Sequence, residues 1–273
     1  MAAVPADVLA LLASGKTQSV NLMEWLATDM SALACSVAAG CDDATSATLL
    51  EAADAMSGLG VTGRLLAAGH AIARDVGGDG ERFEQLATHH SDIVRQWACY
   101  AVNDASIGWP TRHRLEATLR FADDHNMSVR ETAWMAFRPH LAADVDGVLR
   151  LLMPLTGSAS SNIRRFAVEV TRPRSVWGMH IAPLKRHPER AIALLEAVAA
   201  DESRYVQLAV GNWLNDASKS RPDWVTTVCN RWADSGSSHT DFITRRGSRS
   251  LSRLRGETRA RGVLLDGAEG DAV

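Results

Sequence analysis

The stretch Ser161–Trp177 gathers side chains whose types can do chemistry together. Glu169 is a carboxylate, which can act as a general base or stabilise a developing positive charge. Trp177 supplies an indole whose face attracts cations, and four arginines supply guanidinium groups that bind phosphates or carboxylates in a bidentate manner. This combination is costly to arrange for packing alone, so the stretch is the first candidate for a functional site. The four arginines are Arg164, Arg165, Arg172 and Arg174.

The same stretch predicts a helix that carries Glu169 near its end. Apolar residues recur at i, i+3, i+4 and i+7, which is the period of one helix face. Ser161 or Asn162 can cap the helix by accepting an orphan N–H, and Pro173 ends it. Glu169 lies outside the apolar stripe, so its carboxylate and the arginines gather at one helix end. The stripe consists of Ile163, Phe166, Ala167 and Val170.

The composition favours an all-α chain. Of 273 residues, 46% are hydrophobic and 22% are charged, which is ordinary for a globular protein. Alanine and leucine dominate, whereas alternating β-branched runs are hard to find. No run of about 18 apolar residues and no secretion signal is seen, so we expect no membrane partner.

The four cysteines show neither CxxC spacing nor a paired histidine cluster. We therefore expect reduced, mostly buried thiols in a cytoplasmic, nucleoid-associated protein, with no zinc site and no disulfide framework. The cysteines are Cys35, Cys41, Cys99 and Cys229.

The net charge of −3 argues against a nucleic-acid partner, but the distribution of charge does not. Acidic residues are frequent from Glu24 to Asp92, and basic residues gather from Arg130 onward. A protein needs a basic face to bind phosphates, not a basic total. The arginine run from Arg245 to Arg255 is by itself more typical of a solvated segment than of a DNA clamp.

Four similar phrases repeat through the chain: SDIVRQWA, MSVRETAW, SNIRRFAV and SRYVQLAV. Each combines capping residues, a β-branched anchor, a polar pair and small apolar residues. The intervals between anchors are 35, 34 and 43 residues, in the range of HEAT-type helical pairs. We predict an all-α, HEAT-like helical-repeat α-solenoid with a concave DNA-binding face. The anchors are Val94, Val129, Ile163 and Val206.

The chain is expected to divide into a repeat domain over residues 1–236 and a basic C-terminal segment over residues 237–273. The segment should contain one helix near Asp241–Leu254, followed by disorder. Other expected helices are Val4–Leu12, Leu22–Leu33, Thr45–Met56, Arg64–Val76, Phe83–Thr88, Arg112–Phe121, Asp144–Leu152 and Pro188–Ala199.

Several stretches resemble the AlkC branch of the AlkC/AlkD DNA glycosylases, which excise cationic alkylated bases such as 3-methyladenine. The resemblance covers roughly Val20 to Trp232. Some AlkC proteins have an additional immunoglobulin-like domain, for which this chain is expected to be too short. Thr132 stands where many relatives have an aromatic residue. The matching stretches are Val20–Leu33, His89–Ala98, Ser128–Pro139, Ile163–Gly178 and Tyr205–Asp223.

The resemblance implies a DNA repair glycosylase that hydrolyses the N-glycosidic bond of an alkylated base in duplex DNA, as a monomer, without a deep base-flipping pocket and without a metal or organic cofactor. It places the catalytic carboxylates at Glu131, Glu169 and Asp216. Trp177 is the implied base contact, and Trp134 and Trp213 are predicted to bind the substrate with it. The predicted DNA-binding residues are Arg130, Arg164, Arg165, Arg172, Arg174 and Lys219.

Each of these residues also has a plainer interpretation. Glu169 could simply pair with Arg165 or Arg172, and Asp216 could pair with Lys219 at i+3. Glu131 could match the helix dipole, and the tryptophans could fill the core. Two alternative functions therefore remain open: a non-catalytic HEAT-repeat scaffold that binds DNA or protein, and a family member that binds DNA without cutting it.

Overall fold

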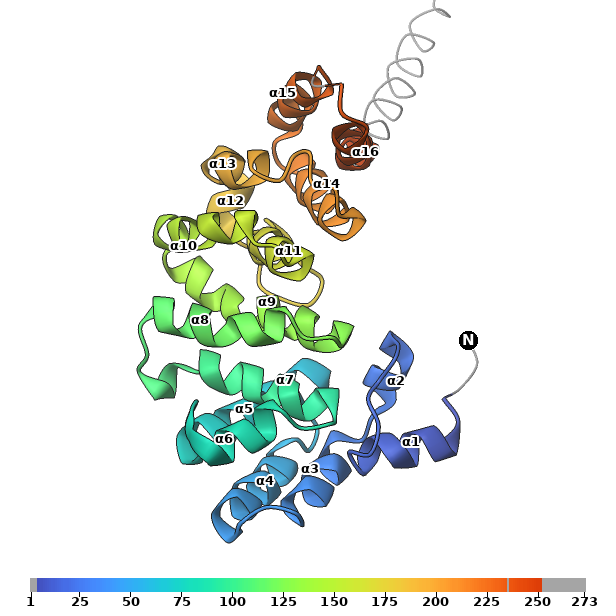
Figure 1. Cartoon of the computed structure of the whole chain (residues 1–273), viewed down its shortest axis with the longest axis vertical. Coiled ribbons are helices and arrows are strands. Elements are labelled where there is room, and N and C mark those ends of the chain that lie inside the picture. Colours follow the sequence, from blue (N-terminus) through green and yellow to red (C-terminus); the bar gives the residue numbers. More distant parts are fainter. Residues whose placement is uncertain (1–3, 235, 252–273) are drawn as a thin grey trace, which may run out of the picture. The chain divides into compact units, whose positions relative to one another are not determined.

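The computed structural model describes residues 4–234 and 236–251 (Figure 1). Every regular element within these ranges is helical, which confirms the all-α, helical-repeat prediction. None of the described helices is long and apolar enough to cross a bilayer. The concave DNA-binding face stays a prediction.

The chain forms two compact units, one ending at His140 and the other beginning at Leu141. In the first unit α3 packs on α4, α4 on α5, and α5 on α7, which also contacts α6 and α8. The last helix of this unit, α9, crosses the division between the units. The elements are α1 (Ala6–Ala13), α2 (Leu22–Ala27), α3 (Met30–Ala38), α4 (Asp43–Ala55), α5 (Val61–Asp75), α6 (Gly80–Ala87), α7 (Asp92–Asn103), the 3-10 helix η1 (Ala105–Ile107), α8 (Thr111–Ala122) and α9 (Met127–Ala143).

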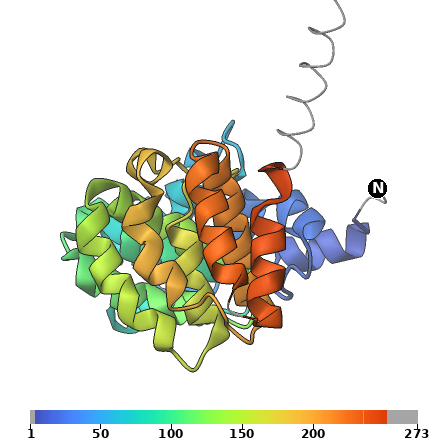
Figure 2. The same cartoon turned by 90° about the horizontal axis from the view of Figure 1, so that it is seen from above.

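In the second unit α14 packs against α11 and against both α15 and α16. Figure 2 shows α15 and α16, in orange-red and red, running side by side. The elements are α10 (Val145–Leu152), η2 (Met153–Gly157), α11 (Ser161–Val170), α12 (Ala182–Arg186), η3 (Pro188–Ala191), α13 (Ile192–Glu196), α14 (Arg204–Ser218), α15 (Pro222–Ala233) and α16 (Ser238–Gly247).

Each of the four sequence phrases forms the start of a helix, and each β-branched anchor is buried in the core. The phrases open α7, α9, α11 and α14. Burying the anchor removes apolar surface from water and fixes the helix face that turns inward. The buried anchors are Val94, Val129, Ile163 and Val206.

One side chain in each repeat holds the loop that precedes its helix. The residue directly after each anchor donates to backbone carbonyls six and five residues earlier. In the first repeat, Arg95 Nη1 lies 2.7 Å from the carbonyl oxygen of His89 and 2.8 Å from that of His90. Loop carbonyls that would need water are thereby satisfied inside the protein. We call these four side chains the repeat clamps: Arg95, Arg130, Arg164 and Gln207.

Two repeat clamps also bind an aspartate in the loop of the next repeat. Arg95 Nε and Nη2 contact the two carboxylate oxygens of Asp124 at 2.7 and 3.0 Å. Arg164 contacts Asp201 in the same manner at 2.6 and 3.0 Å. Charge-assisted, bidentate pairs of this kind are among the strongest hydrogen bonds in proteins. They join the loop of the first repeat to that of the second, and the loop of the third repeat to that of the fourth.

Two predicted helices are divided in the structure, and the predicted cap of a third is displaced. The predicted helix Leu22–Leu33 is two helices, α2 and α3, because Asp29 caps α3 by accepting from the N–H groups of Ser31 and Ala32. The predicted helix Pro188–Ala199 is divided into η3 and α13. The cap of α11 is Ser160, one residue before the position expected.

The predicted domain division at residue 236 stays a prediction. The helix that follows it, α16, packs on α14 and α15 and begins at Ser238, before the expected start at Asp241. Residues 252–254 of the expected helix and the predicted disordered tail lie outside the described residues.

The four thiols differ in exposure, and this predicts their order of reaction. Cys99 and Cys229 are buried and Cys41 is partly buried, whereas Cys35 is exposed. Burial raises the pKa of the Cys229 thiol to about 11. At pH 8 only about one in a thousand Cys229 side chains is then a thiolate, which is the reactive form. We expect iodoacetamide to label Cys35 first.

Mass spectrometry of peptides from briefly labelled protein measures this order. Labelling in denaturant is the control, because all four thiols should then react at similar rates. Equal labelling of Cys35 and Cys229 in the native protein would contradict the burial of Cys229.

Candidate functional site

Glu169 and Asp216 lie on the neighbouring helices α11 and α14 and share one guanidinium group. Both are buried, with exposed fractions of 3% and 5%. Arg172 Nη1 lies 3.0 Å from Glu169 Oε2. Its Nε and Nη2 lie 2.9 and 2.7 Å from Asp216 Oδ2. The structure therefore brings together two of the three predicted carboxylates, with Arg172 between them.

Two further cations flank this pair. Arg165 Nη2 lies 3.5 Å from Glu169 Oε1, and Lys219 Nζ lies 3.4 Å from Asp216 Oδ1. The Arg165 guanidinium also lies 4.3 Å from the centre of the Tyr205 ring, in a cation–π contact. Three cations therefore surround two carboxylates. We call this group the site cluster: Arg165, Glu169, Arg172, Asp216 and Lys219.

The charge state of Arg172 follows from its two carboxylate neighbours. Burial alone would lower the pKa of its guanidinium, but Glu169 and Asp216 outweigh burial and raise the pKa above its usual value. Arg172 is thus a permanent cation that holds the two carboxylates in fixed positions.

The end of α11 and the middle of α14 are fixed to one another by Trp213. Its indole N–H lies 3.0 Å from both the carbonyl oxygen and the hydroxyl oxygen of Thr171, which caps α11. Trp213 is fully buried. The structure therefore corrects the expectation that Trp213 contacts a base: its ring is inaccessible, and its position keeps Glu169 beside Asp216.

The connection after α11 presents Trp177 to solvent. This loop is closed by a hydrogen bond from the Ile181 N–H to the Pro173 carbonyl oxygen, at 3.1 Å. Trp177 is 43% exposed within it, and Val176 and Met179 are exposed as well. Arg174, in the same loop, donates to the Ser220 hydroxyl at 2.8 Å. Unlike Trp213, the Trp177 side chain is accessible to a ligand.

Two of the predicted DNA-binding arginines hold the protein's own backbone. Arg130 and Arg164 are repeat clamps, and Arg164 also donates from Nε and Nη2 to the Asp201 carboxylate. These contacts give both guanidinium groups a role in holding the loops, and their predicted binding to DNA stays a prediction. The loop contacts could not be predicted from residue types, because their acceptors are backbone carbonyls.

Glu131 and Trp134 lie in the first unit, in α9. The Trp134 indole N–H donates to Glu131 Oε2 at 2.8 Å, and Trp134 is only 4% exposed. Trp134 therefore orients Glu131 and offers little surface to a base. The neighbouring Thr132 is fully buried and donates to Gln96 Oε1 at 2.9 Å. The catalytic role of Glu131 stays a prediction.

Sequence reasoning missed the neighbours of Asp216 on α14. Asn212 lies one helical turn before Asp216, and its side-chain oxygen accepts from both Arg246 and Arg249. The i, i+4 spacing of Asn212 and Asp216 could have indicated that both side chains lie on one face of this helix.

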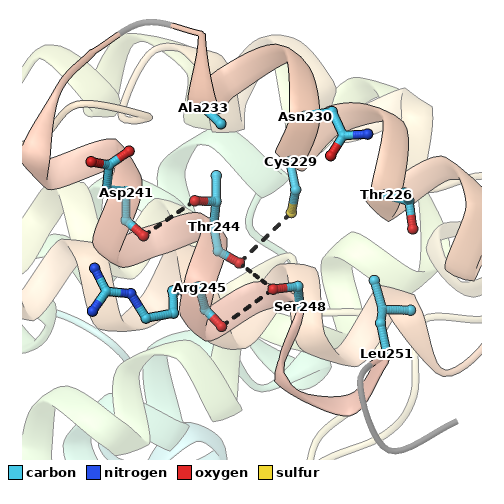
Figure 3. A pocket seen from close by; sticks show the side chains of 9 residues that line it. All are labelled: Thr226, Cys229, Asn230, Ala233, Asp241, Thr244, Arg245, Ser248 and Leu251. Atoms are coloured by element: carbon cyan, nitrogen blue, oxygen red, sulfur yellow. Dashed lines mark hydrogen bonds between the residues drawn. The ribbon is translucent and has the colours of Figure 1, made fainter. Parts of the chain in front are cut away.

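The cavity between α15 and α16 has a volume of ≈ 550 Å³ and is separate from the site cluster (Figure 3). None of its lining residues belongs to the site cluster. Within the described residues, no group of three or more histidine, cysteine, aspartate or glutamate side chains is placed to hold a metal ion. The cavity is lined by Thr226, Cys229, Asn230, Ala233, Asp241, Thr244, Arg245, Ser248 and Leu251.

Two solved structures share this fold. An alkylpurine DNA glycosylase, AlkC from Pseudomonas fluorescens, bound to DNA containing an abasic site analogue, matches with a TM-score of 0.68 and 22% identity over 90% of this chain and 63% of that chain. The structure of smu.31 from Streptococcus mutans UA159 matches with a TM-score of 0.54 and 19% identity over 81% of this chain and 98% of that chain. At these identities the likeness shows the fold.

Sequence comparison extends the likeness to a family. The uncharacterized protein YhaZ of Bacillus subtilis (strain 168) is 36% identical over 120 residues, which cover 44% of this chain and 33% of that protein. The chain thus spans a third of this relative and less than two thirds of the glycosylase. The model of the DNA alkylation repair enzyme family matches residues 63–249, which include the whole site cluster. The chain therefore belongs to the DNA alkylation repair enzyme family.

Proposed function

We propose that this chain is a DNA glycosylase that hydrolyses the N-glycosidic bond of cationic alkylated bases, such as 3-methyladenine, in duplex DNA. The observation that carries the proposal is the buried pair of carboxylates, Glu169 and Asp216, held by Arg172 within the region that matches the family. We propose that the protein works as a monomer.

The chemistry needs little more than negative charge and a positioned water molecule. An alkylated purine is a cation, and it leaves the sugar as a neutral base, so no general acid is required. As the bond to C1′ breaks, the sugar becomes oxocarbenium-like, and a fixed carboxylate stabilises it. Water then adds to C1′ and transfers its proton to the second carboxylate, acting as general base.

The flanking cations and the exposed indole suit the remaining parts of the substrate. We assign phosphate binding to Arg165, Arg172, Arg174 and Lys219, which contribute positive charge beside the carboxylates. The Trp177 face attracts a cationic base by about 0.5–2 kcal/mol, depending on how far the contact excludes water.

Base release from methylated duplex DNA tests the proposed function directly. We expect the wild-type protein to release alkylated purines, measured by chromatography of the freed bases, and to leave abasic sites. A duplex with uracil at one position is the matched control, because uracil carries no charge in the duplex, would have to leave as an anion and should stay attached. Failure to release any methylated base above the protein-free background would refute the proposal.

One observation favours the alternative of a non-catalytic scaffold. Both carboxylates form ion pairs, as the sequence analysis allowed for Glu169 and Asp216 without any catalytic role. Such a network can have a purely structural role. A scaffold would bind duplex DNA and release no base, so the same experiment separates the two functions.

A further inference from the structure

Helices α14 and α16 approach each other unusually closely beside the site cluster. An added Cβ at Gly211 would lie 2.9 Å from Arg246 Cβ, and one at Gly247 would lie 2.7 Å from Leu214 Cβ. Each is closer than real Cβ atoms come to one another. The two glycines therefore let the C-terminal end of α16 lie directly on α14.

This contact brings two guanidinium groups to one neutral oxygen. Arg246 Nε lies 3.0 Å from Asn212 Oδ1, and Arg249 Nη2 lies 3.2 Å from the same atom. Ser250, the next residue, donates to Asn215 Oδ1 at 2.9 Å. Asn212 therefore holds the guanidinium groups of Arg246 and Arg249 close together. The two positive charges repel one another, and a bound anion would reduce this repulsion.

The arginine pair lies next to the carboxylates. Asn212 and Asp216 are four residues apart and so share one face of α14. Partial burial lowers the pKa of the Arg249 guanidinium, and the charges of Arg246 and Arg172 lower it further, whereas Asp216 acts in the opposite sense. Arg249 is therefore close enough to sense the charges of the site cluster.

We propose that Arg246 and Arg249, oriented by Asn212, bind a phosphodiester group of the DNA strand whose sugar lies at Glu169 and Asp216. The inference rests on the proposed function. Every sugar in a strand has a phosphate on either side, so a sugar at the carboxylates brings a phosphate to their neighbours. Paired guanidinium groups match the geometry of phosphate oxygens better than a single ammonium group does.

Asn212→Asp separates a phosphate site from a structural contact. Aspartate has the same shape and keeps an oxygen between the two arginines, but it adds the negative charge that a phosphate would supply. If the arginines only attach α16 to α14, this variant should be as stable as wild type or more stable and should bind DNA normally. If they bind phosphate, its Tm is retained or raised while DNA affinity falls about threefold to tenfold at low salt.

Arg249→Gln and Arg245→Gln form a matched pair of variants. Both residues are exposed, both changes remove one positive charge, and Arg245 lines the cavity on the side of α16 that faces α15. Binding is measured by fluorescence anisotropy on a duplex with a tetrahydrofuran abasic analogue, over a range of salt concentrations. We expect Arg249→Gln to lower the slope of log affinity against log salt by about 0.9, and Arg245→Gln to leave it near the wild-type value.

The outcomes distinguish this inference from the proposed function. Wild-type affinity for Asn212→Asp, or an equal effect of the two arginine variants, would overturn the phosphate site, even if wild-type protein releases methylated bases. DNA binding that falls in Asn212→Asp and Arg249→Gln, without base release by the wild-type protein, would leave the phosphate site standing and refute the glycosylase. A wild-type protein that binds no duplex would refute both.

Discussion

Glu169→Gln and Asp216→Asn are each expected to slow base release by about 10²-fold or more, the usual scale for one preorganised electrostatic group. Each change keeps the size of the side chain and removes the negative charge that stabilises the sugar or activates water. DNA affinity should stay constant or rise, because a negative charge leaves a phosphate-binding surface. Single-turnover excision of a methylated base measures the effect.

The plainer role of these carboxylates makes the opposite prediction. If they only stabilise the fold, the variants lose thermal stability, and the excision rate per folded molecule is unchanged. Asp146→Asn is the matched control in the same unit, because Asp146 also pairs with an arginine, Arg190, at 2.7 Å. The catalytic assignment fails if both site variants excise at the rate of this control.

Arg95→Met is expected to destabilise the protein by about 3–5 kcal/mol, because it leaves Asp124 buried without its cation. The side chains of Arg95 and Asp124 are only 6% and 9% exposed. The change also removes the donor to the carbonyl groups of His89 and His90. Equilibrium unfolding in urea, followed by circular dichroism, gives the loss in the free energy of unfolding.

Arg120→Met is the control for the loss of an arginine pair at the surface. Arg120 contacts both oxygens of Glu84, but the two side chains are 40% and 49% exposed. Water solvates such a pair, so its removal should cost at most about 1 kcal/mol. Similar losses for Arg95→Met and Arg120→Met would show that the repeat clamp is not a major source of stability.

The repeat register could be predicted from the sequence because burial acts on every copy in the same way. A β-branched residue at one position of each phrase, such as Val94 or Val206, enters the core and sets the helix face. Helix ends were predicted less well, because local capping decides them. Asp29 interrupts what reads as one amphipathic helix, and no periodicity reveals this.

The site could be predicted only in part. The i, i+3 spacing of Glu169 and Arg172 predicts their pairing, but the link from Arg172 to Asp216 depends on how α11 packs against α14. From the sequence, the arginines that directly follow the β-branched anchors could not be distinguished from arginines that bind phosphates. Their acceptors decide the matter, and for Arg164 these are carbonyls of its own loop and an aspartate 37 residues away.

The repeat clamps also determine where the chain can change in length. Each clamp reaches a carbonyl six residues earlier, in all four repeats, whereas the intervals between anchors are 35, 34 and 43 residues. An insertion within the six-residue segment would break the clamp, and an insertion beyond it would not. The longest interval, from Ile163 to Val206, contains the loop with Trp177. We therefore expect insertions to be tolerated between the six-residue segments. There they can lengthen a loop beside the site without changing how the helices stack.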